Sequence, residues 1–268
     1  MSVSAPVKLR TLVDDHYRVD ANEKVVLPGV PAYDDDFARD SHDFFNLIAL
    51  VPLVVLNILN WNLDILLDGI DGRNMEKAWT GEWFAAFWWA TLIYFGLDLI
   101  WVALVPSCVK SPGTIIKHHI ATLVYILVPY LNPEYQWCMG VCMSVEINTW
   151  FLIARRVFNK QGFTPWIIKL PPLFSIRVKL ISIFFYISWI TIRCILYPIL
   201  LFHFIATHNK LAKQFGTPFN MMIIVVPLHL VFCMLNFQWT HTLLMSKIRY
   251  WKKTKNVKKL DDSFSKGL

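Results

Sequence analysis

Long apolar runs separated by short polar segments dominate the chain. A helix of roughly 20 apolar residues crosses the hydrocarbon core of a bilayer, and six runs approach that length. They cover about Phe44 to Leu63, Trp83 to Val105, Ile115 to Leu131, Tyr135 to Ile153, a stretch within Ile176 to Ala206, and Met221 to Met245. A soluble protein would need six nearly uncharged helices of this length in one small domain. The pattern therefore predicts an all-α fold, a polytopic transmembrane bundle of about six spanning helices.

Turn-forming residues punctuate these runs, and they fall where membrane loops are expected. They are Gly69 to Gly72, Ser111 to Gly113, Asn132 to Glu134, and Pro171 with Pro172. The third run is short enough to be re-entrant and the fifth is long enough to tilt or break, so five or seven spans remain open. The predicted division is a polar acidic tail over 1–43, a membrane domain over 44–245 and a basic tail over 246–268.

Composition and charge agree with a membrane location. Hydrophobic residues make up 56% of the chain and charged residues 17%, which leaves too little polar surface to cover a soluble globule. With six spans, 21 of the 26 Lys and Arg residues fall on the side of the two termini and four on the other side, with Arg193 inside a run. Because basic loops stay in the cytosol, both termini are predicted to be cytosolic. The formal charge of +7 then reflects orientation, and nucleic acid is not expected as a partner.

The cysteines and histidines carry no legible metal or disulfide pattern. Five cysteines lie within or beside apolar runs, where thiols behave as small hydrophobic groups. The spacing matches no zinc motif or disulfide framework. We expect no metal site.

Three charged residues lie within the apolar runs, namely Asp98, Glu146 and Arg193. Each would cost on the order of 3 kcal/mol at the bilayer centre if it faced lipid. They are therefore expected to face the interior of the bundle. Two interpretations remain open: an internal ion pair that fixes the packing, or a polar-lined intramembrane cavity that binds a ligand.

Five or six polar or aromatic groups from four of the runs are predicted to fall into one polar layer in the cytosolic half of the membrane, namely Asp98, Glu146, His118, His119, Asn236 and Trp239. At 1.5 Å per residue, Asp98 and Glu146 lie roughly 10 Å below the cytosolic face, and Arg193 further toward the opposite side. Helical spacing aligns Tyr94 with Asp98 on one face of the second run. The remaining candidates enter from the third, fourth and sixth runs; they are His118, His119, Thr122, Asn148, Thr149, Asn236 and Trp239.

The same residues, in this order, resemble the TLC-domain membrane proteins, the group that unites ceramide synthases with the translocating-chain-associating membrane protein. The similarity covers about Phe44 to Met245. It rests on Tyr94 with Asp98, on the string His118-His119-Ile120-Ala121-Thr122-Leu123, and on Glu146-Ile147-Asn148-Thr149-Trp150-Phe151-Leu152 with Arg155. Phe185, Arg193, Pro198, Asn236 and Trp239 add to it.

This resemblance implies an integral protein of the endoplasmic reticulum or a related membrane that handles long-chain lipids. His118 and His119 match the paired histidines that ceramide synthases require for transfer of a fatty acyl group from acyl-CoA to a sphingoid amine. Glu146 or Asp98 would be the partner carboxylate, because a carboxylate can steady the imidazolium cation. No cofactor is expected, and acyl-CoA would be a co-substrate.

The fourth run departs from the ceramide synthases. These enzymes carry a His-Asp pair followed three residues later by a second Asp, whereas this chain has Val145, Glu146 and Thr149 at those positions. The pattern is closer to the smaller members of the family. Three hypotheses follow: a non-catalytic protein of lipid homeostasis that binds a long-chain acyl lipid or sphingolipid, an acyl-CoA-dependent N-acyltransferase, and a membrane cargo receptor or interaction protein. Membrane lipids are the expected partners, and a homo-oligomer is left open.

Overall fold

A computed structural model describes residues 18–19, 25–26, 37–68, 75–158 and 171–265. These residues are helical apart from short connections and a two-residue antiparallel pair, β1 (Arg18–Val19) with β2 (Val25–Val26). Six helical segments are long and apolar enough to cross a membrane, which confirms the predicted fold class. The helices in chain order are α2 Phe37–Leu59, α3 Leu63–Asp68, α4 Met75–Ala78, α5 Phe84–Leu104, η2 Pro106–Cys108, α6 Pro112–Leu131, η3 Pro133–Tyr135, α7 Gln136–Cys142, α8 Val145–Phe158, α10 Pro171–Ser188, η4 Trp189–Leu196, α11 Tyr197–Phe215 and α12 Met222–Ser265.

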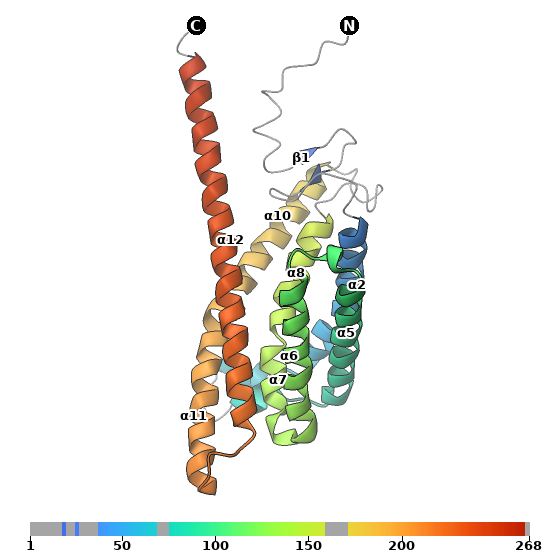
Figure 1. Ribbon diagram of the computed structural model, residues 1–268, viewed down its shortest axis with the longest axis vertical. Coiled ribbons are helices and arrows are strands. Elements are labelled where there is room, and N and C mark those ends of the chain that lie inside the picture. Colours follow the sequence, from blue (N-terminus) through green and yellow to red (C-terminus); the bar gives the residue numbers. More distant parts are fainter. Residues whose placement is uncertain (1–17, 20–24, 27–36, 69–74, 159–170, 266–268) are drawn as a thin grey trace.

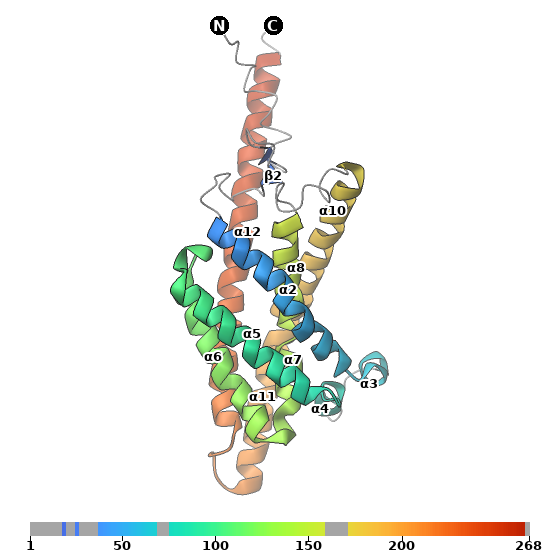
Figure 2. The ribbon, with the colours of Figure 1, turned by 90° about the vertical axis from the view of Figure 1, so that its right-hand side faces the viewer.

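The six spans run up and down through the bundle (Figures 1 and 2). The start of α2, the loop between α5 and α6, the end of α8 and the start of α10 lie at one end, from which α12 projects. We call this end of the bundle the α12 end. Span α2 packs against α5 and α8, while α11 and α12 form an antiparallel hairpin. The first helix begins at Phe37, earlier than the apolar pattern predicted, and so brings His42 and Asp43 into the buried interior.

The fourth span is interrupted. Its helices α7 and α8 are separated at Met143 and Ser144, and the Ser144 hydroxyl donates a hydrogen bond to the Gly140 carbonyl. Gly140 also marks a close approach of two backbones: a Cβ added there would lie 2.3 Å from the Trp79 carbonyl oxygen. Glycine is therefore required where the segment after α4 crosses α7.

Replacing Gly140 by alanine should destabilise the protein by about 2 kcal/mol, the usual size of an overpacking penalty. The clash is with a backbone atom, so no side-chain rotation relieves it. Gly96→Ala is the matched control, because nothing lies within 4 Å of a Cβ at this helical glycine, and alanine favours helix. Thermal unfolding in detergent should show a lower midpoint for Gly140→Ala and an equal or higher one for Gly96→Ala. Equal midpoints in the two variants would contradict the close approach.

The fifth span contains a π-helical segment, η4, for which Pro198 supplies the reason. Proline has no N–H and its ring crowds the carbonyl of the fourth residue before it. The helix widens just before the proline, and the Tyr197 N–H bonds to the Ile192 carbonyl, five residues back. Wide turns of this kind often occur at functional sites, and Arg193 lies within this one.

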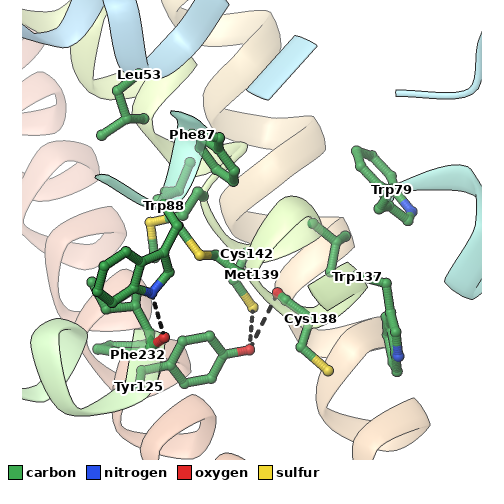
Figure 3. Packing of buried hydrophobic residues seen from close by; sticks show 14 of the residues in the cluster. Leu53, Trp79, Phe87, Trp88, Tyr125, Trp137, Cys138, Met139, Cys142 and Phe232 are labelled. Carbon is green, nitrogen blue, oxygen red and sulfur yellow. Dashed lines mark hydrogen bonds between the residues drawn. The ribbon is translucent and has the colours of Figure 1, made fainter. Parts of the chain in front are cut away.

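An apolar and aromatic core joins buried side chains of α2, α5, α6, α7, α8, α11 and α12. In Figure 3 the Tyr125 hydroxyl lies against the Cys138 carbonyl, at 3.2 Å, and the Cys142 sulfur, at 3.1 Å. His229 is also packed here: its Nε2 donates to the Tyr197 carbonyl at 2.9 Å and its ring stacks on Tyr197. These groups form hydrogen bonds within the core, and we assign them a role in packing.

Candidate functional site

A buried carboxylate, Asp98 in α5, is surrounded by hydrogen-bond donors from two neighbouring helices. His42 Nε2 in α2 lies 2.6 Å from Oδ1, and Asn46 Nδ2 donates to the same oxygen at 3.2 Å. His119 Nε2 in α6 bonds to Oδ2. The Tyr94 hydroxyl donates to Asn46 Oδ1 at 2.7 Å and so holds that amide in place. We call these five residues the Asp98 cluster.

The Asp98 cluster fixes the orientation of both imidazole rings. An ionised carboxylate can only accept hydrogen bonds, so His42 and His119 must both donate from Nε2. In a neutral His119 ring the other nitrogen, Nδ1, then carries the lone pair. It is buried and has no hydrogen-bond partner among the described residues. His119 is thus held with its basic nitrogen directed away from Asp98.

A second cluster surrounds the guanidinium of Arg193. Its Nε donates to Asn148 Oδ1 at 2.7 Å, its Nη1 to Asn236 Oδ1 at 2.6 Å, and its Nη2 to the Thr149 hydroxyl at 3.1 Å. The cation also lies over two indole rings, 4.9 Å from the Trp189 centroid and 5.4 Å from that of Trp239. These six residues, the Arg193 cluster, join α8, η4 and α12.

His118 connects the two clusters. Its ring centroid lies 5.5 Å from that of His119 and 5.7 Å from that of Trp239, with Phe232 on another side at 5.6 Å. Its Nδ1 is buried and has no hydrogen-bond partner in the described part of the chain. The Asp98 cluster, His118 and the Arg193 cluster therefore form one continuous polar layer inside the bundle.

Glu146 lies between the clusters, in the first turn of α8 just after the break in the fourth span. Its side chain is only 4% exposed, and its electrostatic neighbours include Arg193, Thr149, His119 and Asp98. An acidic residue in the first turn is also favoured by the positive end of the helix dipole. Glu146 thus has a cation, a hydroxyl group and an imidazole among its neighbours.

Three buried polar atoms of this layer lack hydrogen-bond partners among the described residues. They are Nδ1 of His118, Nδ1 of His119 and Nδ2 of Asn236. A buried polar group without a partner costs about 1 to 3 kcal/mol, so such atoms call for an explanation. Together they offer at least one donor and two imidazole nitrogens to a polar group placed between α6 and α12.

The structure brings the predicted site residues together, with one correction and one exception. Arg193 was expected further toward the opposite side, but its guanidinium reaches Asn148, Thr149 and Asn236 within the layer. The reason is that the fifth span is 37 residues long, so a depth counted along it does not give the height of the residue. The exception is Thr122, whose hydroxyl donates to the His118 carbonyl of its own helix.

Three residues of the two clusters, His42, Asn46 and Trp189, were not predicted from the sequence. His42 and Asn46 stand at the beginning of the first span, before or within the first turn of the apolar run, and were assigned to the tail or left unremarked. Their spacing of four residues, which places both on one helix face, could have identified them from the sequence. Among the described residues no group of three or more His, Cys, Asp or Glu side chains is arranged to hold a metal ion.

Comparison with protein families matches residues 41–245 to the model described as the TLC domain. That range covers most of the chain and every span, apart from the first four residues of α2 and the projecting end of α12. Comparison with curated proteins and with solved structures finds no match.

Proposed function

The chain belongs to the TLC-domain family, and from this membership and the buried polar layer we propose that it acts in lipid homeostasis by binding a long-chain acyl lipid or sphingolipid inside the bundle. The observation that carries the proposal is the set of three unpartnered polar atoms on His118, His119 and Asn236. A hydroxyl, amide or carboxyl group of a lipid matches this set, because such groups both donate and accept. The lipid's hydrocarbon chain would lie among the apolar side chains of the spans.

Mass spectrometry of lipid that co-purifies with the protein tests this proposal. We expect a long-chain lipid with a polar functional group at or near its head to be retained by the natural protein. Glu146→Gln should lower the retained amount about tenfold, the effect of losing roughly 1.4 kcal/mol of charge-assisted binding. Phe237→Leu is the control, because Phe237 is 75% exposed on the outer face of α12. Equal retention by both variants would reject binding in the layer.

A second function, N-acyl transfer, is favoured by the orientation of His119. Its Nε2 is held by Asp98, so Nδ1 could remove a proton from an amine while the amine nitrogen attacks the thioester carbonyl of acyl-CoA. The new C–N bond forms as the C–S bond breaks, and the departing thiolate takes up the proton. Purified protein given labelled acyl-CoA and a sphingoid base should then form an amide, and His119→Ala should abolish it. Absence of product from the natural protein would reject N-acyl transfer and leave lipid binding as the proposed function.

The cellular placement is part of the same proposal. We place the protein in the endoplasmic reticulum membrane with the α12 end of the bundle in the cytosol. The orientation is supported by the excess of Lys and Arg on that side, since basic segments are retained in the cytosol. Protease digestion of intact microsomes should remove an epitope placed after Leu268 while sparing one placed in the turn after Gly216.

A further inference from the structure

Three polar side chains from three spans meet at the α12 end of the bundle. Arg155 of α8 donates from Nη1 to the Tyr186 hydroxyl of α10 at 3.3 Å, and its guanidinium lies 4.9 Å from the centroid of the Phe185 ring. The Lys247 ammonium of α12 lies 5.7 Å from the centroid of the Tyr186 ring. We call Arg155, Tyr186 and Lys247 the rim.

The rim carries two positive charges, those of Arg155 and Lys247. Neither Arg155 nor Lys247 forms an ion pair with a carboxylate in the part of the chain that the structure describes. Both side chains are half-buried rather than extended into solvent. Two cations gathered around one phenol repel each other, and partial burial weakens the screening of that repulsion by salt. An anion between them would replace the repulsion by two charge-assisted hydrogen bonds.

The position of the rim narrows the chemical class of the anion. Arg155 lies three residues before the end of its span at Phe158, and Lys247 two residues before the end of its span at Arg249. Both therefore lie near the level of lipid headgroups. Above η4, α10 leans away from α12 in both views of the ribbon (Figures 1 and 2), and α10 packs against α8 instead. The rim thus lies where two lipid-facing spans diverge.

The rim also lies above the Arg193 cluster, on the same three spans of the bundle. Thr149 and Arg155 are six residues apart on α8, a rise of roughly 9 Å. A lipid whose headgroup occupied the rim would have its first chain atoms at the depth of the layer.

From these observations we propose that the rim is a binding site for the phosphate of an anionic phospholipid, held by Arg155 and Lys247 with the Tyr186 hydroxyl as a further donor. A lipid is the source that the location favours over a soluble phosphate, because the cations stand beside apolar and aromatic groups at the membrane surface. This site is separate from the polar layer, so it does not require the proposed function to be correct.

Native mass spectrometry of the full-length protein in detergent tests the proposal by titration with two lipids of identical acyl chains. We expect phosphatidic acid to bind about tenfold tighter than phosphatidylcholine, the effect of roughly 1.4 kcal/mol from the exposed phosphate charge. The double substitution Arg155→Gln with Lys247→Gln should remove this preference. Arg155→Lys and Lys247→Arg, which keep the charges, should retain most of it. Tyr186→Phe should weaken it less than the double substitution does.

The control is the double substitution Lys210→Gln with Lys213→Gln, which removes two exposed lysines at the opposite end of the bundle. It should leave the preference for phosphatidic acid unchanged. A preference that survives loss of Arg155 and Lys247 in a protein with an unaltered unfolding midpoint would overturn the proposal, as would an equal loss in the control. Displacement of phosphatidic acid by millimolar inorganic phosphate would overturn the lipid assignment. The Glu146→Gln variant separates the two proposals, because it should keep the rim preference while losing the lipid retained in the layer.

Discussion

Replacement of Asp98 by alanine is expected to destabilise the protein by about 3 to 5 kcal/mol, the usual cost of removing one partner from a buried charged cluster. Asp98 is 3% exposed and is bonded to His42, Asn46 and His119. Alanine would leave these three buried donors without the acceptor that they share.

Unfolding can be followed with a thiol-reactive dye, because Cys108, Cys138 and Cys142 are buried in the folded protein and react on unfolding. Asp98→Asn should cost less than Asp98→Ala, since the amide keeps the shape and one acceptor oxygen. Leu97→Ala is the matched control: the neighbouring side chain is 50% exposed on the outer surface. If Asp98→Ala and Leu97→Ala unfolded at the same temperature, Asp98 would not be the centre of a structural cluster.

Replacement of Arg193 by methionine should cost about 3 kcal/mol, because it removes three hydrogen bonds from a charged donor. The acceptors on Asn148 and Asn236 would be left buried, and Glu146 would lose a nearby cation. Arg193→Lys should restore only part of the stability, because an ammonium cannot match the planar arrangement of donors that a guanidinium presents. Chemical or thermal unfolding in the same detergent measures both variants.

A double-mutant cycle separates the contribution of charge from that of hydrogen bonding. Glu146→Gln introduced into the Arg193→Met protein should cost less than it does in the natural protein, since it removes a carboxylate that has already lost its cation. We expect a coupling of about 1 to 2 kcal/mol. Additive effects within about 0.5 kcal/mol would show that Glu146 and Arg193 do not interact.

The sequence predicts the membrane architecture well because apolar runs of spanning length carry a strong physical signal. Six runs correspond to the six spans, and Pro171 and Asn132 lie at the boundaries where helices start or stop. The break between α7 and α8 and the π-helical η4 were not predicted, although the fifth span was expected to tilt or break. Both depend on local backbone arrangements, at Ser144 and Pro198, that leave hydropathy unchanged.

The sequence predicts most residues of the candidate site, but not which of them contact one another. The cost of a charge in lipid identifies Asp98, Glu146 and Arg193 as interior residues. Helical spacing adds polar residues on the same helix faces, such as Tyr94 beside Asp98. Which groups pair cannot be obtained in this way, because pairing depends on how each helix is rotated and how far it slides. His42 shows the limit: it precedes the apolar run, yet the helix extends to Phe37 and carries it inward to Asp98.

The final helix, α12, runs without interruption from Met222 to Ser265, and its one proline, Pro227, precedes Asn236. No joint therefore separates the projecting end from the residue that holds the Arg193 guanidinium, and the stretch between them behaves as a stiff rod. The residue that anchors the Arg193 guanidinium and the end that projects from the bundle thus belong to one unbroken helix.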